Sequence, residues 1–164
     1  MLSKFPIVHH ENRDVSIAGP ERRGLLHCVM ALPPSLHAGL PAGTQLHAIC
    51  VHLGLQERHR RQQVDMLCRH IEAAVPAAAP LIVAGDFNDW QGRAHDPLTR
   101  GTGLREVFVE LQGRAARTFP ARFPVLRLDR IYVRNAAISS ASVLAMRPWS
   151  HLSDHAALVA EVQL

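Results

Sequence analysis

The chain has 164 residues, of which 48% are hydrophobic and 20% are charged. This length fits one domain that can bury a core, and the composition is that of a globular protein rather than a disordered one. No run of about eighteen apolar residues is present, and no basic-then-apolar leader follows Met1, so the sequence shows neither a membrane span nor a secretion signal. The formal net charge is +4, and much of the positive charge comes from arginine. This excess modestly favours an anionic partner.

The first third of the chain alternates apolar runs with turn-rich segments. Residues 19–24 and the proline- and glycine-rich residues 33–43 have the composition of loops. The apolar runs between them predict strands. The predicted strands are Met1–Ile7 (with its turn), Val8–Ile17, Leu25–Leu32 and Leu46–His52.

The clearest predicted element is a helix from Glu57 to about Val75, ended by Pro76. Its apolar residues recur at helical spacing, and Arg60, Arg61 and Arg69 are expected to face away from them. The apolar residues are Val64, Leu67, Cys68 and Ile71. A buried strand is expected next, at Leu81–Ala84. The strand-helix-strand order predicts a crossover between parallel strands.

The last part of the chain is predicted to hold one short helix and three strands. A loop surrounds Trp90, and Thr118–Leu126 is interrupted by prolines, which predicts irregular structure. The expected elements are a helix at Leu104–Leu111 and strands at Leu128–Val133, Ile138–Met146 and Ala156–Val162.

Three widely spaced cysteines, Cys28, Cys50 and Cys68, form no C-x-x-C pair. Two lie in apolar predicted strands and one on the apolar face of the predicted helix. We therefore expect buried, reduced thiols rather than disulfides or zinc ligands, and a cytoplasmic protein.

Polar groups capable of chemistry stand at strand ends in four places. Open sheets gather ligand-binding and catalytic groups at such ends, so four occurrences in one short chain predict a site for a metal ion and a phosphate. The four segments are Val51-His52-Leu53, Gly85-Asp86-Phe87-Asn88, Leu128-Asp129-Arg130-Ile131-Tyr132 and Ser153-Asp154-His155. G-x-S-x-G, Walker and dinucleotide-binding glycine motifs are absent from the sequence.

Asp86 and Asn88 are the strongest pair, and Gly85 before them permits close approach of other groups to the backbone. At alternate positions of an extended chain, their side chains leave on the same side. The acid can hold a cation or a water, and the amide can donate to a phosphoryl oxygen. The alternative is an ordinary strand-to-turn junction, because both residue types favour turns.

Asp129 lies inside an apolar strand, where an ionised acid is costly unless it is paired. His155 is the candidate partner, and the acid would hold the imidazole in one tautomer. The alternative is a salt bridge to Arg127 or Arg130.

Asp154 and His155 are neighbours that should point in different directions, one towards a metal and the other towards a water. The alternatives are a turn capped by Ser153-Asp154 and a metal site made of His151, Asp154 and His155. A lone histidine such as His52 is more often a core residue. Its place before the Gly54 turn, at the same edge as Asp86, favours a phosphate contact or an acid role.

The four segments, in this order, resemble the endonuclease/exonuclease/phosphatase superfamily with its deoxyribonuclease-I-like fold. The resemblance covers essentially the whole chain and includes Arg60-x-x-Gln63 on the helix. It implies an α/β (α+β) fold of the four-layer α/β/β/α sandwich type. It also implies that the protein is a metal-dependent phosphoric ester hydrolase.

The resemblance also implies a role for each site residue. His155 would orient or deprotonate the attacking water, with Asp129 behind it, and Asp86 and Asn88 would hold the water or the phosphate. Asp154 would bind Mg²⁺, or Mn²⁺ in its place. The implied site residues are His52 (on the scissile phosphate), Asp86 (also a metal ligand), Asn88, Asp129, Asp154 and His155.

One departure from the family pattern is large. The family has an early asparagine and a strand ending in Leu-Gln-Glu, whose acid is the principal metal ligand, and both should precede this chain's first residues. Leu55-Gln56-Glu57 follows His52 and is in the wrong place, so Glu57 is interpreted as a favourable charge at a helix start. We therefore expect residues 1–164 to be one domain that forms the C-terminal two-thirds of the family's domain. Exposed sheet edges should then favour self-association. Without the missing part, residues 1–164 alone are expected to bind magnesium weakly and to turn over slowly or not at all.

The expected activity is magnesium-dependent hydrolysis of a phosphate ester in nucleic acid, a phospholipid headgroup or a soluble phosphodiester. Aromatic residues make up only 5% of the chain, so sequence-specific recognition of nucleic acid is not expected. Two alternatives remain open: a non-catalytic binding or scaffolding relic of the same fold, and a zinc hydrolase that uses His52, His151 and His155.

Overall fold

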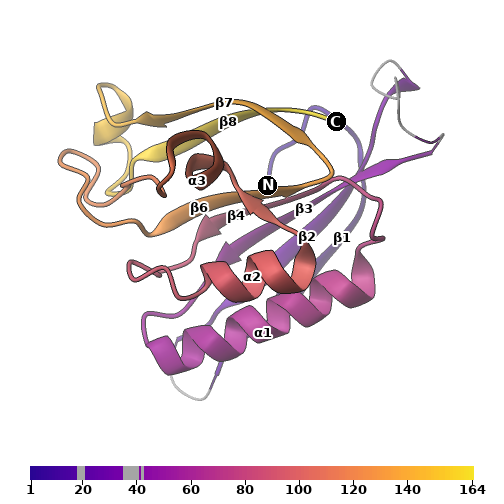
Figure 1. Cartoon of the computed structure of the whole chain (residues 1–164), viewed down its shortest axis with the longest axis horizontal. Coiled ribbons are helices and arrows are strands. Elements are labelled where there is room, and N and C mark those ends of the chain that lie inside the picture. Colours follow the sequence, from indigo (N-terminus) through magenta and orange to yellow (C-terminus); the bar gives the residue numbers. More distant parts are fainter. Residues whose placement is uncertain (18–20, 35–40, 42) are drawn as a thin grey trace.

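A computed structural model describes residues 1–17, 21–34, 41 and 43–164 (Figure 1). The elements are β1 (Ile7–Asp14), β2 (Gly24–Ala31), β3 (Gln45–His52), α1 (Glu57–Ala74), β4 (Leu81–Asp86), α2 (His95–Thr102), β5 (Arg105–Glu106), α3 (Val107–Gln112), β6 (Asp129–Arg134), β7 (Ala137–Leu144), the 3-10 helix η2 (Trp149–His151) and β8 (Ala157–Gln163). The fold is built on one six-stranded sheet, with the two helices α1 and α2 on one face and a two-stranded sheet on the other.

The six-stranded sheet has the order β1-β2-β3-β4-β6-β5. Only β3 and β4 are parallel, and α1 makes the crossover between them, which confirms the predicted strand-helix-strand unit. On the other side of β4, the strand β6 runs antiparallel. The ends of β3 and β4 and the start of β6 therefore meet at one edge of the sheet.

α1 and α2 cover one face of this sheet (Figure 1). Leu67 and Ile71 of α1 are fully buried and pack in one cluster with Ile49 of β3 and Val83 of β4. Each such side chain contributes roughly 2 kcal/mol relative to exposure, so the helical layer is the main hydrophobic core. None of the helices in the described residues is long and apolar enough to cross a membrane.

The opposite face of the sheet packs against β7, β8 and α3 (Figure 1). Phe108 of α3 and Val133 of β6 are fully buried there, against half-buried apolar residues such as Val143 and Leu158 of the hairpin. A helical layer, a large sheet and a small sheet are therefore present, which agrees with the predicted mixed α/β fold. Within the described residues, no helix covers the outer face of β7 and β8, where the fourth layer was expected.

A chain of buried histidines runs beneath α1. Arg13 Nη1 donates to Nδ1 of His70 at 2.6 Å, and His70 Nε2 lies 3.0 Å from His27 Nδ1. His27 Nε2 in turn lies 3.0 Å from His47 Nδ1. Because arginine can only donate, each ring in the chain accepts at Nδ1 and donates from Nε2. All three rings are therefore held neutral, each with its proton on Nε2.

Most predicted elements lie close to the observed ones, but several predictions were wrong. Residues 1–6 form no strand, and the first strand begins at Ile7. The segment expected as one helix from residue 104 is divided into the short strand β5 and α3. The helix α2 was not predicted. Of the expected loops, residues 18–20, 35–40 and 42 lie outside the described residues.

Two predictions of burial were also wrong. Cys50 is exposed because it lies on the face of β3 opposite α1, whereas Cys28 is buried and Cys68 is half-buried. All three cysteines are free, as expected. Arg60 does not face solvent: it is buried and donates to the carbonyl oxygens of Gly54 and Leu55. Arg60 therefore anchors the turn that follows β3.

Candidate active site

Three strand ends bring His52, Asp86 and Asp129 into one row across the sheet. His52 of β3 is the parallel register partner of Asp86 of β4, and Asp86 is the antiparallel partner of Asp129 of β6. The two acids are each only 18% exposed in their side chains, whereas His52 is 59% exposed. The predicted convergence of these three residues is confirmed.

His155 reaches this row from the loop before β8. Its Nδ1 lies 2.8 Å from Oδ2 of Asp129, which confirms the predicted pair. The loop is held in place by backbone bonds, from Ala156 N to the Thr118 oxygen and from Ala121 N to the Asp154 oxygen, both 2.7 Å. A carboxylate that accepts a hydrogen bond from Nδ1–H holds the proton on that nitrogen and leaves Nε2 free to take a proton.

The two alternative partners do not contact the carboxylate of Asp129, although Arg130 Nη1 lies 3.4 Å from the backbone oxygen of Asp129. Arg127 donates from Nε to the Ala115 oxygen, and Arg130 donates from Nη2 to the Asp89 oxygen. Neither arginine forms a salt bridge with Asp129 in the described structure.

The electrostatics of the pair favour a base. Burial of the His155 ring opposes its protonated form, but the hydrogen bond to Asp129 and the charges of the nearby aspartates outweigh burial and raise its pKa. A histidine with a raised pKa binds a proton from water more strongly than an ordinary one. The ring of Phe119, 5.1 Å from the imidazole, packs against one side and restricts its position.

The environment of Asp86 disfavours its ionised form. Burial raises the pKa of its carboxyl and the charge of Asp129 adds to the effect, while a hydrogen bond from Asn88 N partly offsets it. Two half-buried acids in register repel each other, and a cation or a protonated partner would relieve this repulsion. His52 Nε2 lies 3.6 Å from Asp86 Oδ2, at the long end of an ion pair.

Asn88 lies beside Asp86, but its side chain does not leave an extended strand as predicted. Its φ is 50°, in the left-handed region, and its backbone N donates to Asp86 Oδ1 at 2.8 Å. The side-chain amide is buried and donates to the Leu53 oxygen at 2.9 Å. The pair therefore forms the strand-to-turn junction that was the alternative. Gly85 also behaves as expected: a Cβ there would lie 2.1 Å from the Val51 oxygen.

Arg23 is a site residue that the sequence analysis missed. Its Nη1 lies 3.1 Å from His52 Nε2, and its Nη2 lies 3.3 Å from a carboxylate oxygen of Glu21. An arginine can only donate, so a ring nitrogen of His52 is the acceptor in this contact. The signal available in the sequence was a charged cluster directly before β2, which pairs with β3. Arg23 therefore places a positive charge beside His52.

Asp154 is exposed, and the contacts of its side chain are local. Ser153 Oγ accepts from His155 N at 3.1 Å and lies 3.5 Å from Asp154 Oδ1, so the serine closes the turn, as the capping alternative expected. His151, on η2, has its Nδ1 3.0 Å from Ser150 Oγ. Asp154 thus leaves its carboxylate accessible, one residue from His155.

No group of three His, Cys, Asp or Glu side chains in the described part of the chain is arranged to hold a metal ion. Zinc sites in proteins need three or four such ligands, so the zinc alternative finds no support in this geometry. The carboxylates whose charges act on His155 are those of Asp129, Asp86 and Asp154. Magnesium is often bound by one or two carboxylates and otherwise by water and substrate phosphate, so this sparse oxygen set fits magnesium.

A cavity of about 330 Å³ opens beside the pair, lined by Gly85, Asp129, Ser153 and His155 among others. A larger cavity, about 700 Å³, lies between α1 and α2 and contains none of the predicted site residues. Of the two cavities, only the smaller one is lined by His155 and Asp129.

Comparison with known proteins assigns the chain to a family. The model of the Endonuclease/Exonuclease/phosphatase family matches residues 1–155. An uncharacterized protein of Escherichia coli K12, YbhP, is 50% identical over 164 residues, which are 100% of this chain and 62% of that protein. The chain thus spans about three-fifths of the length of this curated relative.

Two solved structures share the fold at low sequence identity. A mannosyl-6-phosphatase of Bacteroides thetaiotaomicron matches with a TM-score of 0.76 and 18% identity, over 98% of this chain and 68% of that chain. TDP2 of D. rerio, complexed with a single-strand DNA product, matches with a TM-score of 0.74 and 17% identity, over 96% and 68%. With the family match over nearly all its residues, the chain belongs to the endonuclease/exonuclease/phosphatase family.

Proposed function

We propose that the protein hydrolyses a phosphate ester, with water as the nucleophile and His155 as the group that orients or deprotonates it. The observation that supports this most is the 2.8 Å contact between His155 Nδ1 and Asp129 Oδ2, with Asp86 in register beside it. Family membership and the phosphatase and DNA-product names of two structural neighbours agree with phosphate chemistry.

Each residue of the site has a proposed role in the reaction. Asp129 keeps the proton of His155 on Nδ1, so that Nε2 can accept one from water, and its charge stabilises the imidazolium that forms. His52 and Arg23 would contact oxygens of the scissile phosphate, while Asp86 would hold the water or a metal-bound ligand. The amide of Asn88 supports the Leu53 turn, so its proposed contact with phosphate would depend on its second N–H.

We propose Mg²⁺ as the cofactor, held by Asp86 and Asp154, with Mn²⁺ as a substitute. The ion would offset the negative charge that develops on the phosphoryl oxygens. The three free cysteines favour a reducing compartment, which supports a cytoplasmic location. Self-association through sheet edges stays a prediction. The outermost strand β1 is exposed along its whole length, although its charged residues oppose pairing.

The test is hydrolysis of bis-p-nitrophenyl phosphate by the chain and by single variants. His155→Ala and Asp129→Asn should lose at least about a hundredfold in rate, because each removes the base or its orientation. His151→Ala is the matched control: it should keep the rate under this proposal and lose it if zinc bound by His151 were required. Retention of activity by His155→Ala would overturn the proposal.

Metal dependence is tested on the same substrate. Chelation by EDTA should abolish turnover, and Mg²⁺ or Mn²⁺ should restore it, whereas restoration by Zn²⁺ alone would contradict the magnesium assignment. Rates are compared with the wild-type chain of the same length, since the chain spans 62% of the curated relative.

A further inference from the structure

Two loops at the catalytic end of the molecule carry a concentration of exposed apolar side chains. Phe123 is 80% exposed, Met146 79% and Leu152 71%, and Val125 and Trp149 are also exposed. We call residues 113–127 and 145–152 together the apolar-arginine rim. Large apolar side chains that are this exposed and this close together mark an interaction surface.

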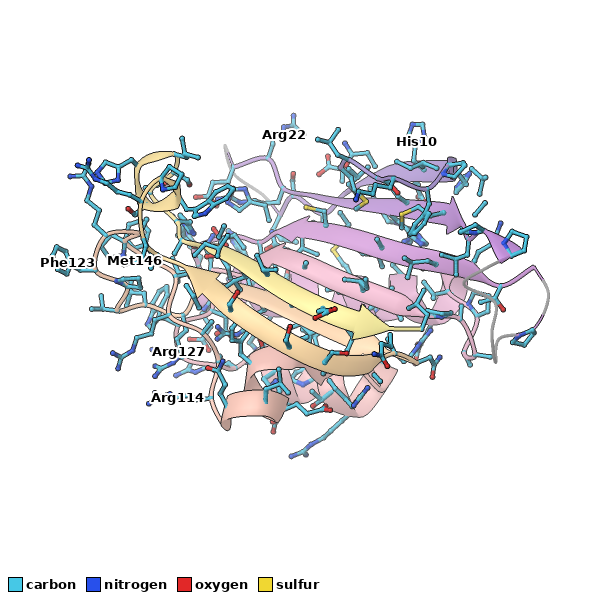
Figure 2. All side chains as sticks on the ribbon, turned by 90° about the horizontal axis from the view of Figure 1, so that it is seen from above. His10, Arg22, Arg114, Phe123, Arg127 and Met146 are labelled. Carbon is cyan, nitrogen blue, oxygen red and sulfur yellow. The ribbon has the colours of Figure 1, made fainter. Side chains whose placement is uncertain are left out.

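The two loops are one surface. Ala121 N donates to the Asp154 oxygen at 2.7 Å, which ties the first loop to the segment that directly follows the second. Figures 1 and 2 both place the loops at the same end, and Figure 2 shows Phe123 and Met146 there together with Arg114 and Arg127. Phe119, at the base of the first loop, packs against His155, so the rim borders the catalytic pair.

The apolar side chains stand on ordered turns. Phe123 N donates to the Pro120 oxygen at 3.1 Å, and Val125 N donates to the Phe119 oxygen at 2.9 Å. In the second loop, Ser150 N donates to the Met146 oxygen and Leu152 N to the Trp149 oxygen, both at 3.1 Å. A surface that is already ordered loses little conformational entropy when it binds.

The charge of the rim has one sign. Its two segments contain five arginines and no acid, in a chain whose formal net charge is +4, so the rest of the chain is close to neutral. Four of these arginines are exposed, and none of the four forms an ion pair within the described residues. The five are Arg114, Arg117, Arg122, Arg127 and Arg147.

We propose that the rim docks on an anionic phospholipid bilayer. Exposed apolar side chains among arginines are the pattern of proteins that insert apolar groups at the lipid interface while their cations contact anionic headgroups. Nucleic acid would also attract the arginines. However, Met146, Leu152 and Val125 are aliphatic and cannot stack on bases, whereas burial in the acyl region suits them. A headgroup phosphate ester as substrate follows from this surface only if the proposed function holds.

The test is co-sedimentation of the chain with vesicles of phosphatidylcholine alone or with about 30% phosphatidylglycerol, at low and high salt. The wild type should sediment with the anionic vesicles at low salt. The triple variant Phe123→Ser/Met146→Ser/Leu152→Ser should lower the partition coefficient at least about ten-fold, since it removes three large apolar groups. Arg122→Gln/Arg147→Gln should lower it by about five-fold for each arginine.

Matched controls lie outside the rim. Val8→Ser/Val159→Ser removes exposed apolar side chains of β1 and β8, and Arg100→Gln removes an exposed arginine of α2. These controls and His155→Ala should bind vesicles like the wild type. Binding by an inactive His155→Ala separates failure of the lipid surface from failure of the catalytic proposal.

Three results would overturn the proposal. The first is no binding to anionic vesicles at low salt, and the second is equal loss in rim and control variants. The third is that the rim variants bind vesicles like the wild type but change another property. A change only in the binding of a labelled single-stranded DNA would assign the rim to nucleic acid, and a change only in the elution volume would assign it to contact with a second copy of the chain.

Discussion

The buried histidine chain makes the stability of the protein depend on pH between about 4 and 6.5. Burial, followed by the charges of His70 and His47, lowers the pKa of His27 from 6.5 to about 4, and Glu11 offsets part of this. Burial likewise lowers the pKa of His47 and of His70, where Arg13 adds to the effect. The folded state therefore binds fewer protons than the unfolded state. Stability is complete above the unfolded pKa and is lost as the pH falls towards the folded one.

The magnitude follows from His27 alone. At about 1.4 kcal/mol for each tenfold difference in proton affinity, its lowered pKa corresponds to about 3 kcal/mol in all. About 2 kcal/mol of this should be lost between pH 7 and pH 5. We expect His27→Gln to be less stable than the wild type at pH 7, because it breaks the hydrogen-bonded chain, but to lose about 2 kcal/mol less on acidification.

The assay is urea unfolding followed by circular dichroism at a series of pH values, for the wild type, His27→Gln and His10→Gln. His10 is exposed on β1, so its variant should follow the wild-type curve at every pH. If His27→Gln and the wild type lost equal free energy of unfolding between pH 7 and pH 5, the histidine chain would not be the source of the dependence.

Three further predictions concern single residues. Asp129→Asn should lower kcat by roughly 10²–10⁴ with little change in KM, because the imidazole keeps its place but loses its tautomer and its countercharge; steady-state kinetics checks this. Gly85→Ala should lower the free energy of unfolding by at least about 3 kcal/mol, because the added Cβ would overlap a carbonyl oxygen of β3. Gly101→Ala on α2 is the control: open space surrounds this glycine, so the variant should be as stable as the wild type or more stable in thermal unfolding. Arg60→Met should lower the free energy of unfolding by about 3 kcal/mol, because it leaves the buried Asp89 and two carbonyl oxygens without their partner. Arg61 is exposed, so Arg61→Met should change the free energy of unfolding by less than about 0.5 kcal/mol in the same urea assay.

The sequence was sufficient for the parts of the fold that depend on local patterns. The apolar runs and the helical spacing placed β3, α1 and β4, and the crossover made the two strands parallel. α2 was missed because it contains Pro97 and Gly101, which predict a loop. Its formation is decided by packing, since Leu98 of α2 is fully buried in the helical core. Tertiary contacts overrode local propensity there.

The same division holds for the site. His52, Asp86 and Asp129 were predictable because each stands at a strand end, and strand ends meet at one edge of a sheet. Arg23 was not, because its contact with His52 depends on the register of β2 against β3 and on no motif. The orientation of Asn88 depends on a left-handed backbone conformation, which the alternation of an extended strand cannot anticipate.

His155 and Asp129, the proposed catalytic pair, reach each other because the β7–β8 hairpin returns to the large sheet. Asp129 begins β6, before the hairpin, and His155 lies two residues before β8, the second strand of the hairpin. A transient detachment of the hairpin would thus separate the two groups while the helical core stays folded. Turnover should disappear at a lower denaturant concentration than the circular dichroism signal of α1, and amides of β8 should exchange with solvent before those of β3.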